Sequence, residues 1–262
     1  MFKDPRVFQI FSLCLFLFLG FNLWQFQVSV LQIIILFLSG ILSSFALGFK
    51  GSRLKSTVIT CLGLALLLRT DFLLIWALAP LLALLSKKIL RLADYSIFNP
   101  ANFALIFLHM LLPQYVWVSS GQWSQAIYYI LAMIVMGIWV TRKVSTLTIS
   151  LSYLCFLIAF KAVQILYIYG DSFEIFQNHL SQASLYLFAF FMISDPRTSA
   201  TTWPTQVIYS FILALLTFIG IYEGANPYAP FYALFVLSLV FNLYRALNKD
   251  DVFIWHDSLV KK

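Results

Sequence analysis

Ten apolar segments follow one another along the chain, and charged residues or Pro, Gly and Asn separate them. Apolar segments of this kind, joined by short polar turns, are typical of membrane-spanning helices. We therefore predict an all-α polytopic membrane protein of about ten transmembrane helices. The helices are expected near residues 7–24, 30–48, 56–68, 72–85, 100–117, 124–140, 147–167, 180–193, 204–222 and 228–245.

The basic residues fall in alternate loops of this arrangement. Of the 17 Lys and Arg residues, all except Arg69 and Lys161 lie on one side of the predicted membrane. Asp71, Asp171 and Glu223 lie on the other side. Because cytoplasmic loops carry the excess of Lys and Arg, we predict that both termini lie in the cytoplasm.

Two polar motifs occur twice, at nearly the same offset. The predicted helices 56–68 and 180–193 are short for a hydrocarbon core of about 30 Å, and each ends at a turn with an Asp. These residues, Asp71 and Asp195, lie 124 positions apart, and the Asn-Pro pairs that begin at Asn99 and Asn226 lie 127 apart. We predict two five-helix repeats of opposite orientation, residues 1–123 and 124–245, and a cytoplasmic tail, 246–262. The alternative is chance similarity between short apolar segments.

Composition excludes several classes of function. The chain is 62% hydrophobic and 10% charged, so its 262 residues leave no room for a soluble catalytic domain. The net charge of +7 is explained by cytoplasmic loops, and we expect no binding to nucleic acid. The chain has no Ser/His/Asp set, no phosphate-binding Gly-rich loop and no Cys/His cluster, so self-contained hydrolysis is not expected.

The polar segment 194–205 is the strongest candidate site. It carries Asp195, Arg197, Thr198 and Ser199, and irregular backbone within a membrane is tolerated only where it meets protein, water or a ligand. Pro204 suits the first turn of the next helix, whose free N–H groups bind anions. The alternative is a capped cytoplasmic loop in which Asp195 pairs with Arg197.

Three further residues are candidates in the predicted helices. Asn99 is expected to cap the helix that begins at Pro100, which makes Asn102 the better ligand candidate. Lys161 lies within an apolar segment, where it either faces the bundle interior or extends to the outer surface.

Both motifs resemble those of a known family. The run 190–202 resembles the Asp-Pro-x-Thr signature of the RnfD/NqrB family, the membrane subunits of Rnf and sodium-pumping NADH:quinone oxidoreductase complexes. Phe98-Asn99-Pro100-Ala101 is similar to that family's Phe-Asn-Pro-Ala motif, and the run 223–228 lies where a Gly/Pro-rich turn precedes the family's last helix. The compact chain looks most like stand-alone RnfD-like proteins, including the UnbU-type proteins of enediyne gene clusters.

The resemblance implies ten helices in two inverted halves, a flavin cofactor and electron transfer in a bacterial cytoplasmic membrane. In the family an FMN is attached to a Thr between the fifth and sixth helices, but residues 114–125 contain no Thr. We therefore expect any FMN or riboflavin to be held noncovalently. Its expected contacts are Asn99, Asn102, Asp195, Arg197, Thr198 and Ser199, and its expected partners are redox proteins of a membrane complex. In the family's large complexes electron transfer is coupled to ion transport. The alternatives are a channel or transporter on the same scaffold without redox chemistry, and an assembly subunit of a larger complex.

Overall fold

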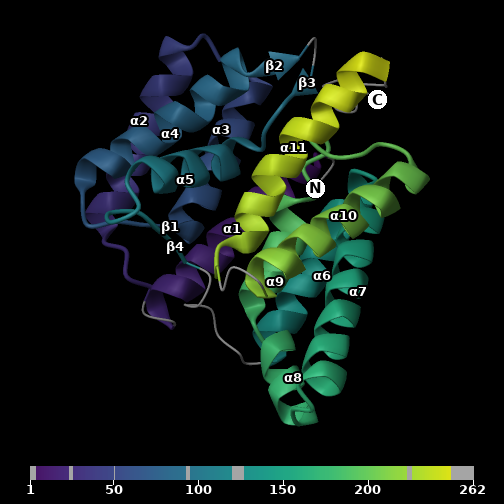
Figure 1. The fold of residues 1–262 in the computed structure, drawn as a ribbon. Coiled ribbons are helices and arrows are strands. Elements are labelled where there is room, and N and C mark those ends of the chain that lie inside the picture. The colour runs from purple at the N-terminus through teal and green to yellow at the C-terminus, as the bar shows by residue number, and fades with distance from the viewer. Residues whose placement is uncertain are drawn as a thin grey trace. The chain divides into compact units, whose positions relative to one another are not determined.

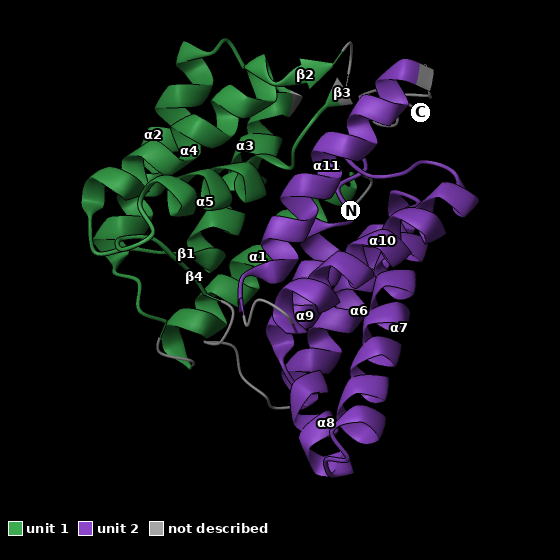
Figure 2. Ribbon diagram, viewed as in Figure 1, with its two compact units in different colours: residues 1–122, 254–262 green, residues 123–253 purple. Residues whose placement is uncertain are grey.

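A computed structural model of the chain describes residues 4–23, 26–49, 51–92, 95–119, 127–222 and 226–248. In this part the chain forms eleven α-helices, two π-helical segments and four two-residue strands (Figure 1). The chain divides into two compact units, residues 1–122 with 254–262 and residues 123–253 (Figure 2). The predicted tail 246–262 lies outside the described residues from position 249 onward.

The first unit is a bundle of five helices. Its core lies around α3, which packs against α1, α2, α4 and α5, while α4 also packs against α2 and α5. Trp76 on α4 and Leu64 on α3 are fully buried in this core. The helices are α1 (Pro5–Asn22), α2 (Val30–Ala46), α3 (Ser52–Leu67), α4 (Leu73–Ile89) and α5 (Pro100–Leu111), and the strands are β1 (Leu68–Arg69), β2 (Arg91–Leu92), β3 (Tyr95–Ser96) and β4 (Trp117–Val118).

Side-chain caps fix where these helices begin. Asp4 accepts a hydrogen bond from the backbone N–H of Arg6, and Pro5 occupies the first turn of α1. Ser29 and Gln32 form a reciprocal capping box at the start of α2. Asn99 Oδ1 accepts from the N–H groups of residues 101 and 102, so its predicted role as the cap of α5 is confirmed.

The predicted helix 100–117 is wrong in its second half. Helix α5 ends at Leu111, because Pro113 disfavours helical backbone at the residue before it. The chain then returns as β4, which pairs antiparallel with β1 at the end of α3. The N–H of Ser119 also donates to the carbonyl of Leu67 (2.7 Å), so this segment satisfies backbone groups that α3 leaves open.

The second unit repeats this order of packing. Helix α10 packs against α7 and α11, as α4 packs against α2 and α5, and α6 packs against the short α9 as α1 packs against α3. Met133, Tyr153 and Leu213 are buried in its core. The elements are α6 (Ile127–Lys143), α7 (Leu147–Ala162), η1 (Val163–Ile168), α8 (Phe173–Leu180), α9 (Ala183–Leu187), η2 (Phe188–Met192), α10 (Trp203–Tyr222) and α11 (Ala229–Asn248).

Two features of this unit differ from the predicted segments. The predicted helix 180–193 is a single α-helical turn, α9, continued by the π-helical η2. Ser150 on α7 donates to the carbonyl of Ala189 in η2 (2.6 Å), which satisfies a backbone group where the regular helical pattern is interrupted. Helix α8 is not among the predicted segments, because half of its eight residues are polar.

The surface of the described part is unusually apolar. Leu42, Trp203 and Leu247 are each more than two-thirds exposed. Soluble proteins rarely expose large apolar side chains over so much of their surface. Four helices of the described part are long and apolar enough to cross a membrane: 5–22, 147–168, 203–222 and 229–247. The chain is therefore an all-α integral membrane protein. Ten spans remain a prediction, because the other apolar helices are shorter.

Candidate functional site

The candidate site is the loop of residues 194–202, between η2 and α10 of the second unit. A tight turn of the loop is closed at the carbonyl of Asp195. This carbonyl accepts hydrogen bonds from the N–H groups of Thr198 (3.1 Å) and Ser199 (3.0 Å). The Ser199 hydroxyl donates to the same carbonyl (2.8 Å), and the Ser194 hydroxyl donates to the carbonyl of Phe190 (2.5 Å). The loop thus satisfies many of its own polar groups.

The Asp195 side chain shapes the first turn of the loop. Its Oδ1 accepts from the backbone N–H of Arg197 (3.1 Å), an arrangement typical of an Asx turn, with Pro196 between them. The side chains of Asp195 and Arg197 are half-buried. A carboxylate and a guanidinium are therefore partly accessible at the loop.

Helices α10 and α11 hold the loop through its backbone. Asn242 Nδ2 donates to the carbonyl of Thr198 (3.1 Å), and an Arg245 guanidinium nitrogen donates to the carbonyl of Ser199 (3.0 Å). Gln206 Nε2 donates to the carbonyls of Ala200 (3.2 Å) and of Ser145 before α7 (2.8 Å). Three consecutive loop carbonyls are therefore bound by buried side chains from two other helices.

The predicted contacts of the second unit divide into two pairs. Thr198 and Ser199 are almost fully buried, and the Ser199 hydroxyl is engaged within the loop. Asp195 and Arg197 are half-buried, while Thr201 and Thr202 beyond them are exposed. A ligand that reaches this loop from outside would meet the second pair and the two exposed threonines before it met the buried hydroxyls.

The predicted contacts of the first unit, Asn99 and Asn102, lie at the start of α5. The side-chain oxygen of Asn99 caps this helix, and Asn102 is 1% exposed in its first turn. The structure brings these two residues together, and it brings the four predicted residues of the second unit together. Their role as ligand contacts stays a prediction.

The polar turn of the first unit is built on the same principle. The carbonyl of Thr70 accepts from Trp76 Nε1 (3.0 Å) and from Gln32 Nε2 (3.2 Å), so side chains of α4 and α2 hold its backbone. Arg69 is buried, donates to the carbonyl of Leu68 (2.6 Å) and lies over the ring of Phe26. The predicted turn after α3 is thus a helix end closed by a buried cation.

Lys161 lies in the last turn of α7 and is half-buried. Whether its side chain faces the bundle interior or extends to the outer surface stays a prediction.

Sequence reasoning missed the three residues that hold the loop. The sequence pattern predicts no role for Gln206 and places Arg245 with the basic residues of the cytoplasmic side, although Arg245 lies within α11 and is 1% exposed. Ser238, Asn242 and Arg245 are spaced by four and three positions, which places them on one face of an otherwise apolar helix. That spacing was the available signal for a buried polar contact.

A sequence model of the NQR2, RnfD, RnfE family matches residues 118–253, more than half of the chain. The matched region contains the whole candidate loop together with α10 and α11. No curated protein matches the sequence.

Proposed function

We propose, because the chain belongs to the NQR2, RnfD, RnfE family, that it is a membrane electron-transfer protein that holds a flavin noncovalently at loop 194–202. One observation carries this proposal. The family match includes a polar loop among apolar helices, and buried Gln206, Asn242 and Arg245 fix the path of its backbone. Binding sites are commonly built on backbone that is held in place before the ligand arrives.

The accessible side chains of the loop fit a flavin. Asp195 and Arg197 are half-buried and Thr201 and Thr202 are exposed, so these four side chains would hold the cofactor, with Arg197 facing the phosphate of an FMN. A bound flavin would accept electrons and pass them to a partner redox protein. The chain's own residues would position and orient it, and the absence of Thr from 114–125 favours noncovalent attachment.

The internal packing supports the proposed arrangement of two inverted repeats. Each unit has a helix that packs against two others in the same chain order, α4 in the first and α10 in the second. Asn99 accepts from the N–H two residues ahead (3.1 Å), and Asn226 does so at the equivalent position before α11 (2.8 Å). An odd number of membrane crossings in each repeat would give the repeats opposite orientations.

The first test is an absorption and fluorescence spectrum of the detergent-purified protein before and after acid precipitation. Flavin released into the supernatant would support the proposed noncovalent site. Flavin that stays in the precipitate would contradict noncovalent attachment. A folded protein that remains colourless after reconstitution with FMN or riboflavin would contradict the flavin assignment.

Variants of Asp195 locate the site. Asp195→Ala should abolish flavin retention, and Asp195→Asn, which keeps an oxygen for the Arg197 N–H, separates loss of charge from loss of the turn. Asp171→Asn is the matched control, because Asp171 is an exposed carboxylate elsewhere in the second unit. Unchanged flavin content in Asp195→Ala would exclude this loop as the site.

One observation favours a second candidate, a transporter or assembly subunit on the same scaffold. The hydroxyls of Ser194 and Ser199 both donate to backbone carbonyls, so their geometry is also that of a purely structural loop. Solute flux in proteoliposomes without a bound chromophore would support a transporter. Co-purification with a larger complex without a bound chromophore would support an assembly role.

A further inference from the structure

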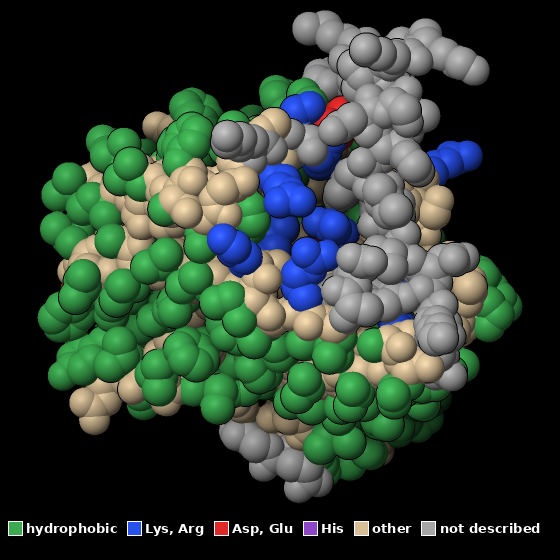
Figure 3. Space-filling view, turned by 90° about the horizontal axis from the view of Figure 1, so that it is seen from above, with side chains coloured by type: hydrophobic (Ala, Val, Ile, Leu, Met, Phe, Trp, Pro, Cys, Tyr) green, Lys and Arg blue, Asp and Glu red, His purple; other side chains and the backbone are tan. Residues whose placement is uncertain are grey.

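Five cationic side chains converge at one end of the first unit. They come from the first turns of two helices and the last turn of a third, and are Arg6 on α1, Arg53 and Lys55 on α3, and Lys87 and Lys88 on α4. We call them the basic cluster. Figure 3 views the molecule from above and shows Lys and Arg side chains gathered on this face, with apolar side chains over the surface to their left and below them.

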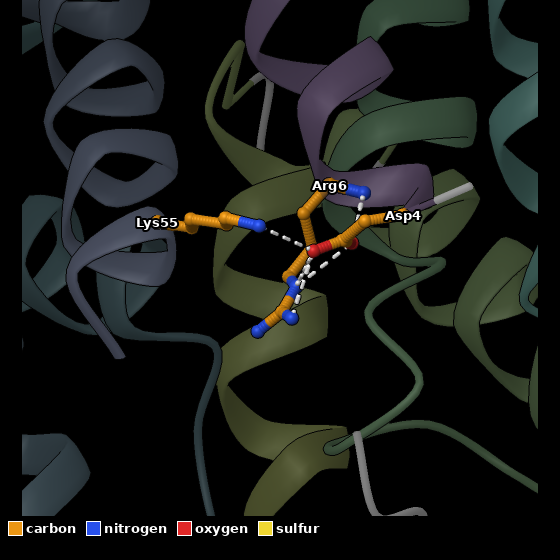
Figure 4. A network of polar contacts seen from close by, with 3 residues as sticks. All are labelled: Asp4, Arg6 and Lys55. Carbon is orange, nitrogen blue, oxygen red and sulfur yellow. Dashed lines mark hydrogen bonds and ion pairs between the residues drawn. The ribbon is translucent and has the colours of Figure 1, made fainter. Parts of the chain in front are cut away.

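Asp4 ties two members of the basic cluster together (Figure 4). Its Oδ2 lies 2.9 Å from a guanidinium nitrogen of Arg6 and 2.8 Å from Lys55 Nζ, so one carboxylate connects the start of α1 to α3. Lys87 Nζ in turn donates to the hydroxyl of Ser56, the residue after Lys55. The cationic groups of three helices are thus held next to one another by specific contacts.

Phe49 lies against this group. The guanidinium carbon of Arg53 and the Nζ of Lys87 lie 5.7 Å and 5.8 Å from the centre of its ring. Lys88 Nζ donates to the carbonyl of Leu47, which lies two residues before Phe49 (3.1 Å). The end of α2 therefore completes a surface to which four helices contribute.

The positive-inside tendency does not account for this geometry. That tendency concerns only the side of the membrane on which Lys and Arg lie, not their burial or their contacts. Here Arg6 and Lys87 are 5% and 9% exposed within helices. Five positive charges and the one negative charge of Asp4 sum to +4, and holding like charges together costs free energy that a bound anion offsets.

The surroundings of the basic cluster indicate which anion. Phe45 in the last turn of α2 is 60% exposed, and Ile89, next to Lys88, is 67% exposed. The cationic groups therefore border apolar surface on two of the same helices. An anionic phospholipid has the complementary structure, a negative headgroup joined to acyl chains.

We propose that the basic cluster is a binding site for the headgroup of an anionic phospholipid, whose acyl chains lie along the exposed apolar side chains of α2 and α4. The site is independent of the proposed flavin site. Arg53, Lys87 and Lys88 contact the phosphate, and Arg6 and Lys55, whose charges Asp4 partly neutralises, lie beside them.

The test is lipid binding to the detergent-purified full chain, measured by native mass spectrometry with phosphatidylglycerol and with phosphatidylcholine of the same acyl chains. Each basic side chain near a membrane surface contributes enough that phosphatidylglycerol should bind roughly tenfold more tightly or better. Equal affinity for the two lipids would overturn the proposal. Inorganic phosphate that displaces phosphatidylglycerol at equal concentration would do the same, because the cluster would then be a site for free phosphate.

A pair of double variants places the lipid. R53Q/K88Q removes two exposed members of the basic cluster and should weaken phosphatidylglycerol binding about tenfold or more. The matched control is R142Q/K143Q, which removes two exposed charges from the end of α6 in the second unit. Equal losses in the two variants would show that only net charge matters and would overturn the site.

Asp4→Asn gives a test of opposite sign. Asn caps a helix as well as Asp does, so α1 keeps its start while the charge sum rises from +4 to +5. The variant should bind phosphatidylglycerol more tightly than the unaltered protein. Unchanged or weaker binding would contradict the proposed role of the cluster's charge.

Discussion

Arg245 shows how one buried cation organises the candidate loop. Its guanidinium donates to the carbonyl of Ser199 (3.0 Å) and to Oδ1 of Asn242 (3.3 Å), and Asn242 donates to the carbonyl of Thr198. The two side chains therefore act together on adjacent peptide groups. Buried charges are tolerated where such hydrogen bonds surround them.

Arg245→Met should destabilise the protein by about 1–3 kcal/mol, because the carbonyl of the buried Ser199 loses this donor. Thermal unfolding in detergent, followed by intrinsic fluorescence, measures the change. Leu247→Ala is the control, since Leu247 is 76% exposed on the same helix. A melting temperature equal to that of the unaltered protein would show that the loop does not depend on this contact.

Asp4 gives a pH dependence with a definite sign. Partial burial raises the pKa of Asp4, but hydrogen bonds from Arg6 and Lys55 lower it more, from 3.8 to about 2. Because the folded pKa is the lower one, the stability that Asp4 contributes is present above about pH 4 and is lost as the pH falls toward 2. The melting temperature of the unaltered protein minus that of Asp4→Asn should be constant from pH 7 to 5 and shrink below pH 4. A difference that grows on acidification would contradict the ion pairs.

At the scale of elements, apolar length and caps predict most of the helices but not where every helix ends. Asn99 with Pro100 marked the start of α5 correctly, because a cap is a local signal. The end of α5 depends on Pro113 and on the pairing of β4 with β1, and the second of these is a long-range contact. Helix α8 is short and amphipathic, so no test for apolar length detects it.

The candidate loop was found from the sequence for a similar reason. Asp195, Pro196 and the hydroxyls around them form a polar interruption that stands out between apolar segments. Asn242 and Arg245, which hold it, lie 44 and 46 positions along the chain from the carbonyls they bind, and only the folded chain brings them to the loop. The sequence alone does not specify which loop these side chains contact.

Gly137 tests the packing of α6 against η2. A Cβ at this position would lie 2.5 Å from Cβ of Phe190, whose attachment to the backbone leaves it no room to move. Gly137→Ala should therefore destabilise the protein by about 1–3 kcal/mol. The matched control is Gly63→Ala on α3, whose Cβ would meet Cβ of Ala101 at an ordinary 3.5 Å.

The control should leave stability unchanged or raise it by up to about 1 kcal/mol, because Ala favours helix over Gly. Thermal unfolding of both variants under the same conditions gives the comparison. Equal destabilisation of the two would indicate a general intolerance of helix substitutions and would contradict the specific clash at Gly137.

At the scale of the whole molecule, the predicted topology has a direct test. The helical run 147–168, α7 with η1, is apolar and long enough to cross a membrane once. Alkaline phosphatase fused after Lys143 should therefore be inactive, and the same enzyme fused after Gly170 should be active outside the cytoplasm. Activity on the same side at both positions would exclude a single crossing and, with it, the predicted repeat.

The way in which the candidate loop is anchored has an evolutionary consequence. Asn242, Arg245 and Gln206 donate hydrogen bonds to main-chain carbonyl oxygens, which every amino acid has. The half-buried position 197 and the exposed positions 201 and 202 can therefore diversify, while Asp195 keeps the first turn of the loop in place. A saturation library at positions 197, 201 and 202 should yield many folded proteins with altered ligand preference. Selection could then change which ligand the loop binds without changing the fold of the loop.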